Sequence, residues 1–200
     1  MAEKKSKGQE RYDELAYEKK NYFEVASEEE RAQMFAYAEG YKAFLDEAKT
    51  EREACAAAVR MAREAGFTEF KFGDKLSTGD KKYFVNRGKS VVVFRVGSEN
   101  LEEDGLRIIA SHIDAPRVDI KQNPLYEEAG MCFLKTHYYG GIKKYQWTTI
   151  PLALHGVVML KDGRKVELNV GEKADDPVFY IDDLLPHLGG EQMAKGGAKV

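Results

Sequence analysis

The fold is decided by one stretch, Arg107-Ile108-Ile109-Ala110-Ser111-His112-Ile113-Asp114-Ala115-Pro116. The apolar run from Leu106 to Ala110 predicts a buried strand, and His112 follows where that strand ends. Ligands in open α/β sheets gather outside the carboxyl ends of strands, so the imidazole has a rigid base and faces solvent. Asp114 lies two residues on, which in extended chain is the same side. We therefore expect its carboxylate to accept the second ring N–H of His112 and to fix the tautomer.

Taken alone, the His-x-Asp pattern has two interpretations. It can be a metal ligand with its supporting carboxylate, or a surface histidine paired with a carboxylate. Surface pairs are common and metal sites are few, so the three residues by themselves favour the surface pair. The sequence around the pattern must decide between the two.

Two helices are predicted before this stretch. Ser27 and Glu30 have the spacing of a capping box, in which each side chain satisfies a backbone N–H group of the first turn. Thr50 and Glu53 have the same spacing, so we expect a second helix to start there instead of one continuous helix. The second helix should end at Gly66, which suits the left-handed position after a helix.

Strand patterns follow this second helix. Tyr83–Asn86 and Ser90–Val96 flank a predicted hairpin turn at Arg87-Gly88-Lys89. The run Val91–Phe94 is apolar on both faces, which predicts a central strand. Two helices on a mixed, buried sheet predict an α/β layered domain.

The pattern changes after about Tyr138, where helical periodicity ends. Three further strands are expected, over residues 150–160, 166–170 and 178–181. Asp162-Gly163 has the composition of a two-residue hairpin loop between the first two. We place a boundary near Gly140-Gly141 and expect a β-rich second unit over residues 141–200. Residues 1–26 are polar and are interpreted as an arm, docked in part by Tyr12, Leu15, Tyr22 and Phe23.

Composition limits the function classes. A net charge of −3 leaves no broad basic field, so nucleic acid and anionic membranes are not expected as partners. No apolar run is long enough to span a bilayer, and residues 1–9 lack the apolar core of a secretory signal. Cys55 and Cys132 are interpreted as two buried free thiols, which is typical of a cytoplasmic protein.

The surrounding motifs resolve the interpretation of His112. The order of blocks is Ser111–Pro116, then Lys121-Gln122-Asn123-Pro124, then Tyr139-Gly140-Gly141, then Trp147. This collinear order resembles the aspartyl-aminopeptidase-like zinc metallopeptidases, relatives of vacuolar aminopeptidase I, and in particular a bacterial branch. Better-known members carry an Asp-Arg-Asp-Leu type segment where this chain has Thr148–Leu152, so substrate preference does not follow from the resemblance.

The resemblance implies the N-terminal part of a two-zinc catalytic α/β domain over residues 27–140, and part of an inserted, β-rich dimerisation domain over 141–200. It implies an aminopeptidase that releases N-terminal residues from peptides, acidic ones among them, and that works as a large homo-oligomer. By the same resemblance His112 is a zinc ligand and Asp114 its supporting carboxylate. His187 corresponds loosely to a histidine that reaches into a neighbouring subunit's active site, where an imidazole can steady an oxyanion; a surface residue at a helix start is the alternative.

The rest of a two-zinc site is not evident in this sequence. In the family the bridging carboxylate, the Glu-Glu pair and the second histidine follow the inserted domain. Glu127-Glu128 is interpreted as a solvated loop, His137 and His155 as structural strand residues, and the aromatic cluster of Tyr138, Tyr139 and Trp147 as core. We therefore expect the chain alone to be inactive. The competing hypothesis is a non-catalytic truncated fragment or assembly module.

Overall fold

The computed structural model describes residues 6–17 and 19–196. It separates into two compact units, one ending at Phe44 and one beginning at Leu45. The boundary expected near Gly140-Gly141 is a different one and stays a prediction. No described helix is both long enough and apolar enough to cross a membrane.

The first unit is helical. It contains α1 (Lys7–Leu15), α2 (Tyr22–Val25) and most of α3 (Glu28–Glu47). The predicted capping box is confirmed: the Ser27 amide donates to the Glu30 carboxylate at 2.8 Å, and the Glu30 amide donates to the Ser27 hydroxyl at 3.2 Å.

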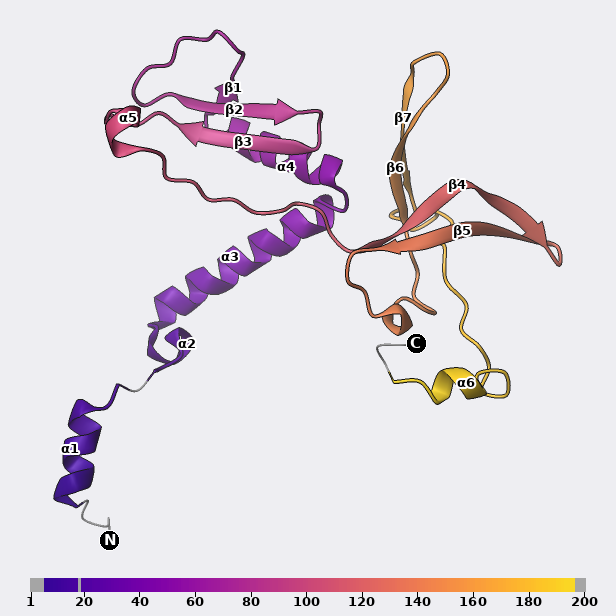
Figure 1. The fold of residues 1–200 in the computed structure, drawn as a ribbon, viewed down its shortest axis with the longest axis horizontal. Helices are drawn as coiled ribbons and strands as arrows, with labels where there is room; N and C mark the ends of the chain where they lie inside the picture. The colour runs from indigo at the N-terminus through magenta and orange to yellow at the C-terminus, as the bar shows by residue number, and fades with distance from the viewer. Residues whose placement is uncertain (1–5, 18, 197–200) are drawn as a thin grey trace. The chain divides into compact units, whose positions relative to one another are not determined.

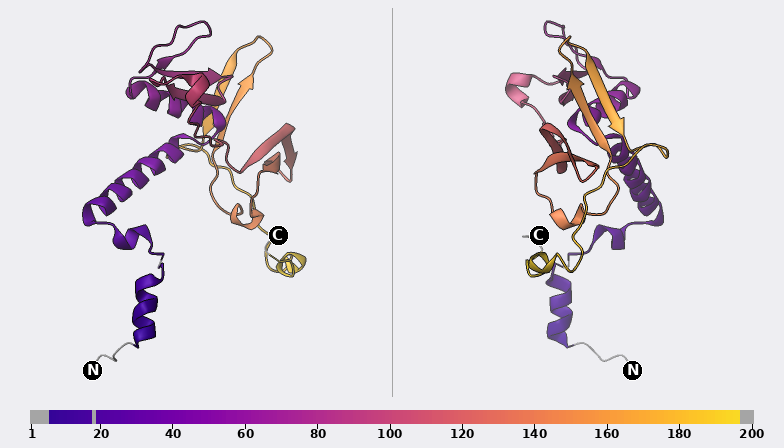
Figure 2. Two further views of the ribbon diagram at one scale, coloured as in Figure 1. Left: turned by 60° about the vertical axis from the view of Figure 1, so that its left-hand side comes forward. Right: turned by 90° about the vertical axis from the view of Figure 1, so that its right-hand side faces the viewer.

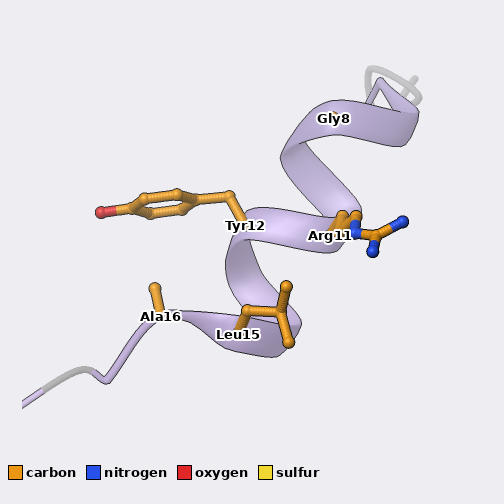
Figure 3. A pocket seen from close by; sticks show the side chains of 5 residues that line it. All are labelled: Gly8, Arg11, Tyr12, Leu15 and Ala16. Carbon is orange, nitrogen blue, oxygen red and sulfur yellow. The ribbon is translucent and has the colours of Figure 1, made fainter.

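The segment interpreted as an arm contacts α3 through its second half. The Tyr22 hydroxyl donates to Glu30 at 2.8 Å, and the Phe23 ring packs edge-on against Phe35. Tyr12 and Leu15, by contrast, are exposed. Together with Gly8 and Arg11 of α1, and Ala16 just after the helix, they line a hollow that is shown in Figure 3 and that no other described element lines.

The second unit begins with α4 (Glu51–Glu64), which packs on a three-stranded sheet (Figure 1). The sheet has the order β1 (Thr68–Glu69), β2 (Lys81–Asn86), β3 (Ser90–Arg95), with β1 parallel to β2 and β2 antiparallel to β3. Small side chains on α4 allow close approach to the sheet: Ala54, Cys55, Ala57 and Ala62 are buried, and so is Tyr83 at 2% exposure. The mixed α/β layer is therefore confirmed, with α4 packed on the sheet.

Both predicted ends of α4 are confirmed. The Thr50 hydroxyl caps the helix by accepting from the Glu53 amide at 3.3 Å. At the other end Gly66 has φ of +82°, and the amides of Gly66 and Phe67 donate to Arg63 and Ala62 at 2.9 Å each. This 5→2 and 6→1 pair is a Schellman motif, which requires a left-handed residue such as glycine.

Two strand predictions were wrong. Val91–Phe94 does form most of β3, but β3 pairs only with β2 among the described residues, so it is an edge strand with Val92 and Val93 exposed. The run Leu106–Ala110, after the short helix α5 (Leu101–Asp104), forms no strand; Leu106, Ile108 and Ile109 are exposed. An apolar run becomes a strand only when a neighbour accepts and donates its backbone hydrogen bonds, and no described strand does so here.

A long hairpin follows, built from β4 (Arg117–Glu128) and β5 (Met131–Tyr139). Its turn is Ala129-Gly130, both with positive φ, as a tight two-residue loop requires. Glu127-Glu128 therefore ends a strand, and the expectation of a loop there was wrong. The register shifts between Ile120 and Leu125, so the Lys121–Pro124 block forms a bulge, which suits a proline that cannot donate to the ladder.

The last sheet is the two-stranded hairpin of β6 (Leu154–Met159) and β7 (Lys165–Val170), which is drawn in orange in Figure 2. The expected hairpin is confirmed, but its loop is longer than two residues, because the Leu160 amide donates to the Arg164 carbonyl at 2.8 Å and encloses Lys161–Gly163. Residues 178–181 make only isolated bridges, Phe179 to Leu152 and Ile181 to Thr148. Two short helices complete the unit, η1 (Lys144–Gln146) and α6 (Gly190–Met193).

Candidate functional site

His112 lies on an exposed loop just before β4, with its side chain 83% exposed. Its Nδ1 lies 2.9 Å from the backbone oxygen of Asp114 and 3.2 Å from Oδ1 of the same residue. Both oxygens can only accept, so Nδ1 carries the proton in this arrangement. In the neutral imidazole Nε2 then carries a free lone pair. This is the tautomer of a histidine that binds a metal ion through Nε2. The predicted His112–Asp114 contact is confirmed, and the prediction that a buried strand carries it was wrong.

The Asp114 carboxylate is held by a second partner that the sequence analysis did not identify. The Tyr139 hydroxyl, at the end of β5, donates to Oδ2 of Asp114 at 2.8 Å. This hydrogen bond, followed by a backbone hydrogen bond and the bond from His112, lowers the pKa of Asp114 below its ordinary value. The carboxylate is thus kept ionised and available to His112.

Tyr139 is in turn covered by Arg117, its cross-strand partner at the start of β4. The guanidinium carbon lies 4.1 Å from the centre of the Tyr139 ring. Arg117 is itself fixed by Asp119, at 2.7 Å from Nε, and by Glu51 of α4, at 3.1 Å from Nη1. A series of contacts therefore runs from α4 through Arg117, Tyr139 and Asp114 to the exposed imidazole.

Gly140 explains why Tyr139 comes so close to the motif. Its φ is +78°, and a Cβ placed there would lie 3.3 Å from Cα of Pro116. Only glycine lets the chain turn away from β5 against Pro116 without strain. The Tyr-Gly-Gly and His-x-Asp-Ala-Pro blocks are thus packed against each other in space, and Tyr139 is not the core aromatic that was expected.

His155 occupies a second ionic cluster within the same unit. It lies on β6, as predicted, with its side chain 10% exposed. Nδ1 lies 2.7 Å from Glu53 of α4, and Nε2 lies 2.8 Å from Glu172, just after β7. Partial burial acts to lower the pKa of His155, but the hydrogen bonds and charges of the two glutamates outweigh it and raise that pKa above its ordinary value.

The remaining candidates are not brought into either cluster. His187 lies in an exposed turn before α6, and His137 is exposed on β5. Among the described residues no three His, Cys, Asp or Glu side chains are grouped so as to hold a metal ion. Both cysteines are free, as predicted, but only Cys55 is buried; Cys132 is exposed on the two-stranded β4–β5 hairpin.

Comparison with known proteins identifies the family to which the chain belongs. A family profile described as "Aminopeptidase I zinc metalloprotease (M18)" matches residues 44–198, more than half of the chain. The chain belongs to the M18 aminopeptidase family. A probable M18 family aminopeptidase 1 of Clostridium acetobutylicum is 44% identical over 190 residues, which are 93% of this chain and 41% of the relative. A second, of Borrelia garinii subsp. bavariensis, is 48% identical over 170 residues, which are 85% of this chain and 37% of the relative.

Solved M18 structures confirm the fold. The chain matches the crystal structure of aminopeptidase I from Borrelia burgdorferi B31 with a TM-score of 0.78 at 45% identity, covering 84% of this chain and 41% of that one. An M18 aminopeptidase from Thermotoga maritima gives 0.78 at 43% identity, with 86% and 37% covered. The resemblance to this family, and to its bacterial branch in particular, is confirmed. The prediction of a partial α/β fold is confirmed as well. The chain spans about two fifths of the length of the relatives it matches.

The M18 profile is described as that of a zinc metalloprotease, and one donor of this chain fits zinc. Nδ1 of His112 is occupied by Asp114, and Nε2 has no described partner. That arrangement is typical of a zinc-bound histidine with its supporting carboxylate. The described residues therefore fit one ligand of a metal site, and not a whole one.

Proposed function

We propose that this chain contributes His112 as a ligand to the two-zinc site of an aminopeptidase that releases N-terminal residues, acidic ones among them, from peptides. The observation that supports this most is the donor state of His112, with Nδ1–H held by Asp114 and Nε2 facing solvent, in a chain of the M18 family. When bound, zinc supplies Lewis-acid polarisation of the scissile carbonyl and a water of lowered pKa.

The role of this chain's residues is to prepare the ligand. Asp114 fixes the tautomer of His112 and increases the basicity of Nε2, because an ionised acceptor on Nδ1–H pushes electron density into the ring. The other metal ligands and the general base are proposed to lie outside residues 1–200.

The two free cysteines also support a proposed cytoplasmic location.

Chelation tests this function. In the protein at the length of its M18 relatives, removal of metal should abolish release of N-terminal residues from short peptides, and added zinc should restore it. The 200-residue chain with zinc should show no turnover, because a catalytic zinc needs about three protein ligands and one imidazole cannot hold it. Turnover by the chelated protein, or by the 200-residue chain alone, would contradict the proposal.

We also propose that the protein is a homo-oligomer associating through the β-rich segment, where His187 is available to a neighbouring subunit. The support is apolar surface there: Val158, Met159, Val166 and Val178 are exposed. Deletion of residues 141–200 should weaken self-association more than deletion of residues 1–26, measured by light scattering. A full-length chain that stays monomeric at micromolar concentration would count against this.

A further inference from the structure

Tyr139 ends β5 with its hydroxyl on the carboxylate that supports His112. A carboxylate that accepts a hydrogen bond at one oxygen can still rotate about its Cβ–Cγ bond. Here Oδ2 of Asp114 accepts from the Tyr139 hydroxyl at 2.8 Å, while Oδ1 faces Nδ1 of His112 at 3.2 Å. The second hydrogen bond restrains that rotation, so Tyr139 helps to set the orientation of the oxygen that His112 meets.

The tyrosine ring has little freedom of its own. Arg117 covers it at 4.1 Å, and the two residues are paired across the β4–β5 hairpin. Arg117 is anchored at three oxygens: Asp119 and Glu51 through their carboxylates, and Ala115 through its carbonyl at 3.4 Å from Nη1. A guanidinium held at several points covers the ring in a fixed position, and through Glu51 it connects Tyr139 to α4.

We propose that Tyr139 is a positioning residue for His112, acting through Asp114, and that Arg117 holds Tyr139 in place. Asp114 and His112 lie on a loop before β4 that pairs with no described strand. The hairpin restrains this loop through Tyr139. Tyr139 thereby favours the Nδ1–H tautomer of His112 and leaves Nε2 free. The role of this tautomer in zinc binding rests on the proposed function.

The test is a comparison of Tyr139→Phe with Tyr138→Phe. Both remove one hydroxyl from neighbouring residues of β5, but Tyr138 points to the other face of the strand, where its ring meets Lys144. The first readout is the tautomer of His112 in metal-free, ¹⁵N-histidine-labelled protein, at a pH where the imidazole is neutral. The sequence has four histidines, and His112→Ala identifies the signal.

In Tyr139→Phe the Nε2–H fraction of His112 should rise by about twofold or more, because a loosened carboxylate holds Nδ1–H less well. Tyr138→Phe should match the wild type. Arg117→Gln should change the tautomer in the same direction by a smaller amount, which keeps the test open if Tyr139→Phe folds poorly. The backbone oxygen of Asp114 still accepts from Nδ1 in all of these, so a complete switch is not expected.

The second readout is zinc affinity of the complete protein, which Tyr139→Phe should lower by up to about tenfold. An unchanged tautomer in folded Tyr139→Phe would overturn the proposal. A changed tautomer with unchanged zinc affinity would support the positioning role and contradict zinc ligation by His112. The two proposals are therefore separated by one pair of measurements.

Discussion

Replacement of His112 by alanine in the complete protein is expected to lower kcat/KM by at least about a thousandfold, ~4 kcal/mol of transition-state stabilisation. The reason is the loss of an imidazole whose Nε2 is free and whose Nδ1 is held by Asp114. Zinc content measured by mass spectrometry should fall along with activity. Asp114→Asn should be milder, with a loss of about 10- to 100-fold, because it changes the support of the ligand and not the ligand.

His137→Ala is the matched control for this experiment. His137 is also an exposed histidine, two positions before Tyr139 on β5, and its imidazole bonds to no described residue. It should leave both zinc content and kcat/KM unchanged. Wild-type activity of His112→Ala at normal zinc content would remove this histidine from the site.

The second large effect concerns stability and involves His155. Its two ring nitrogens face two carboxylates, Glu53 and Glu172, and carboxylates accept only, so the arrangement requires an imidazolium. The side chain is 10% exposed, and its removal leaves Glu53 without the charge opposite it. We expect His155→Gln to lower the free energy of unfolding by about 2 kcal/mol at about pH 6, measured by urea denaturation.

The pH dependence has a definite sign. The pKa of His155 is raised in the folded state above the unfolded value of about 6.5. Its contribution is therefore fully present below about pH 6.5 and is lost as the pH rises through the folded pKa. Wild-type stability should fall over that window relative to His155→Gln, whose curve lacks this titration. Parallel curves for the two proteins would be evidence against a charged His155.

A double-mutant cycle isolates the interaction from the loss of packing. Glu172→Gln should lower stability in the wild type and have little effect in His155→Gln, because the residues share one contact. His137→Gln, at an exposed strand position, should stay within about 0.5 kcal/mol of the wild type. Additive effects of the first two substitutions would show that His155 contributes by packing alone.

Much of the local structure follows from neighbouring residues. The capping box at Ser27, the N-cap at Thr50, the glycine after α4, and the turn between β2 and β3 were predicted, because each depends on hydrogen bonds or φ values within a few residues. The His112–Asp114 contact was predicted for the same reason, since two residues of extended chain bring the side chains together.

Patterns that depend on distant partners were less informative. Leu106–Ala110 has the composition of a buried strand, yet it is exposed because no described strand pairs with it. Cys132 looked like a core residue and lies exposed on a hairpin that forms a separate two-stranded sheet. The apolar character of a residue shows that it can be buried. Whether it is buried depends on which other segments of the fold pack against it.

The sequence alone determined the family, the candidate ligand and its carboxylate, because these are encoded in contiguous motifs. Only the tertiary structure decided that Tyr139 and Arg117 support that carboxylate and that His155 joins α4 to the β6–β7 hairpin. Tyr139 and Asp114 are 25 residues apart, and His155 and Glu53 are 102 apart. No local pattern marks such pairs, since they meet only once strand register and helix packing have brought the segments together.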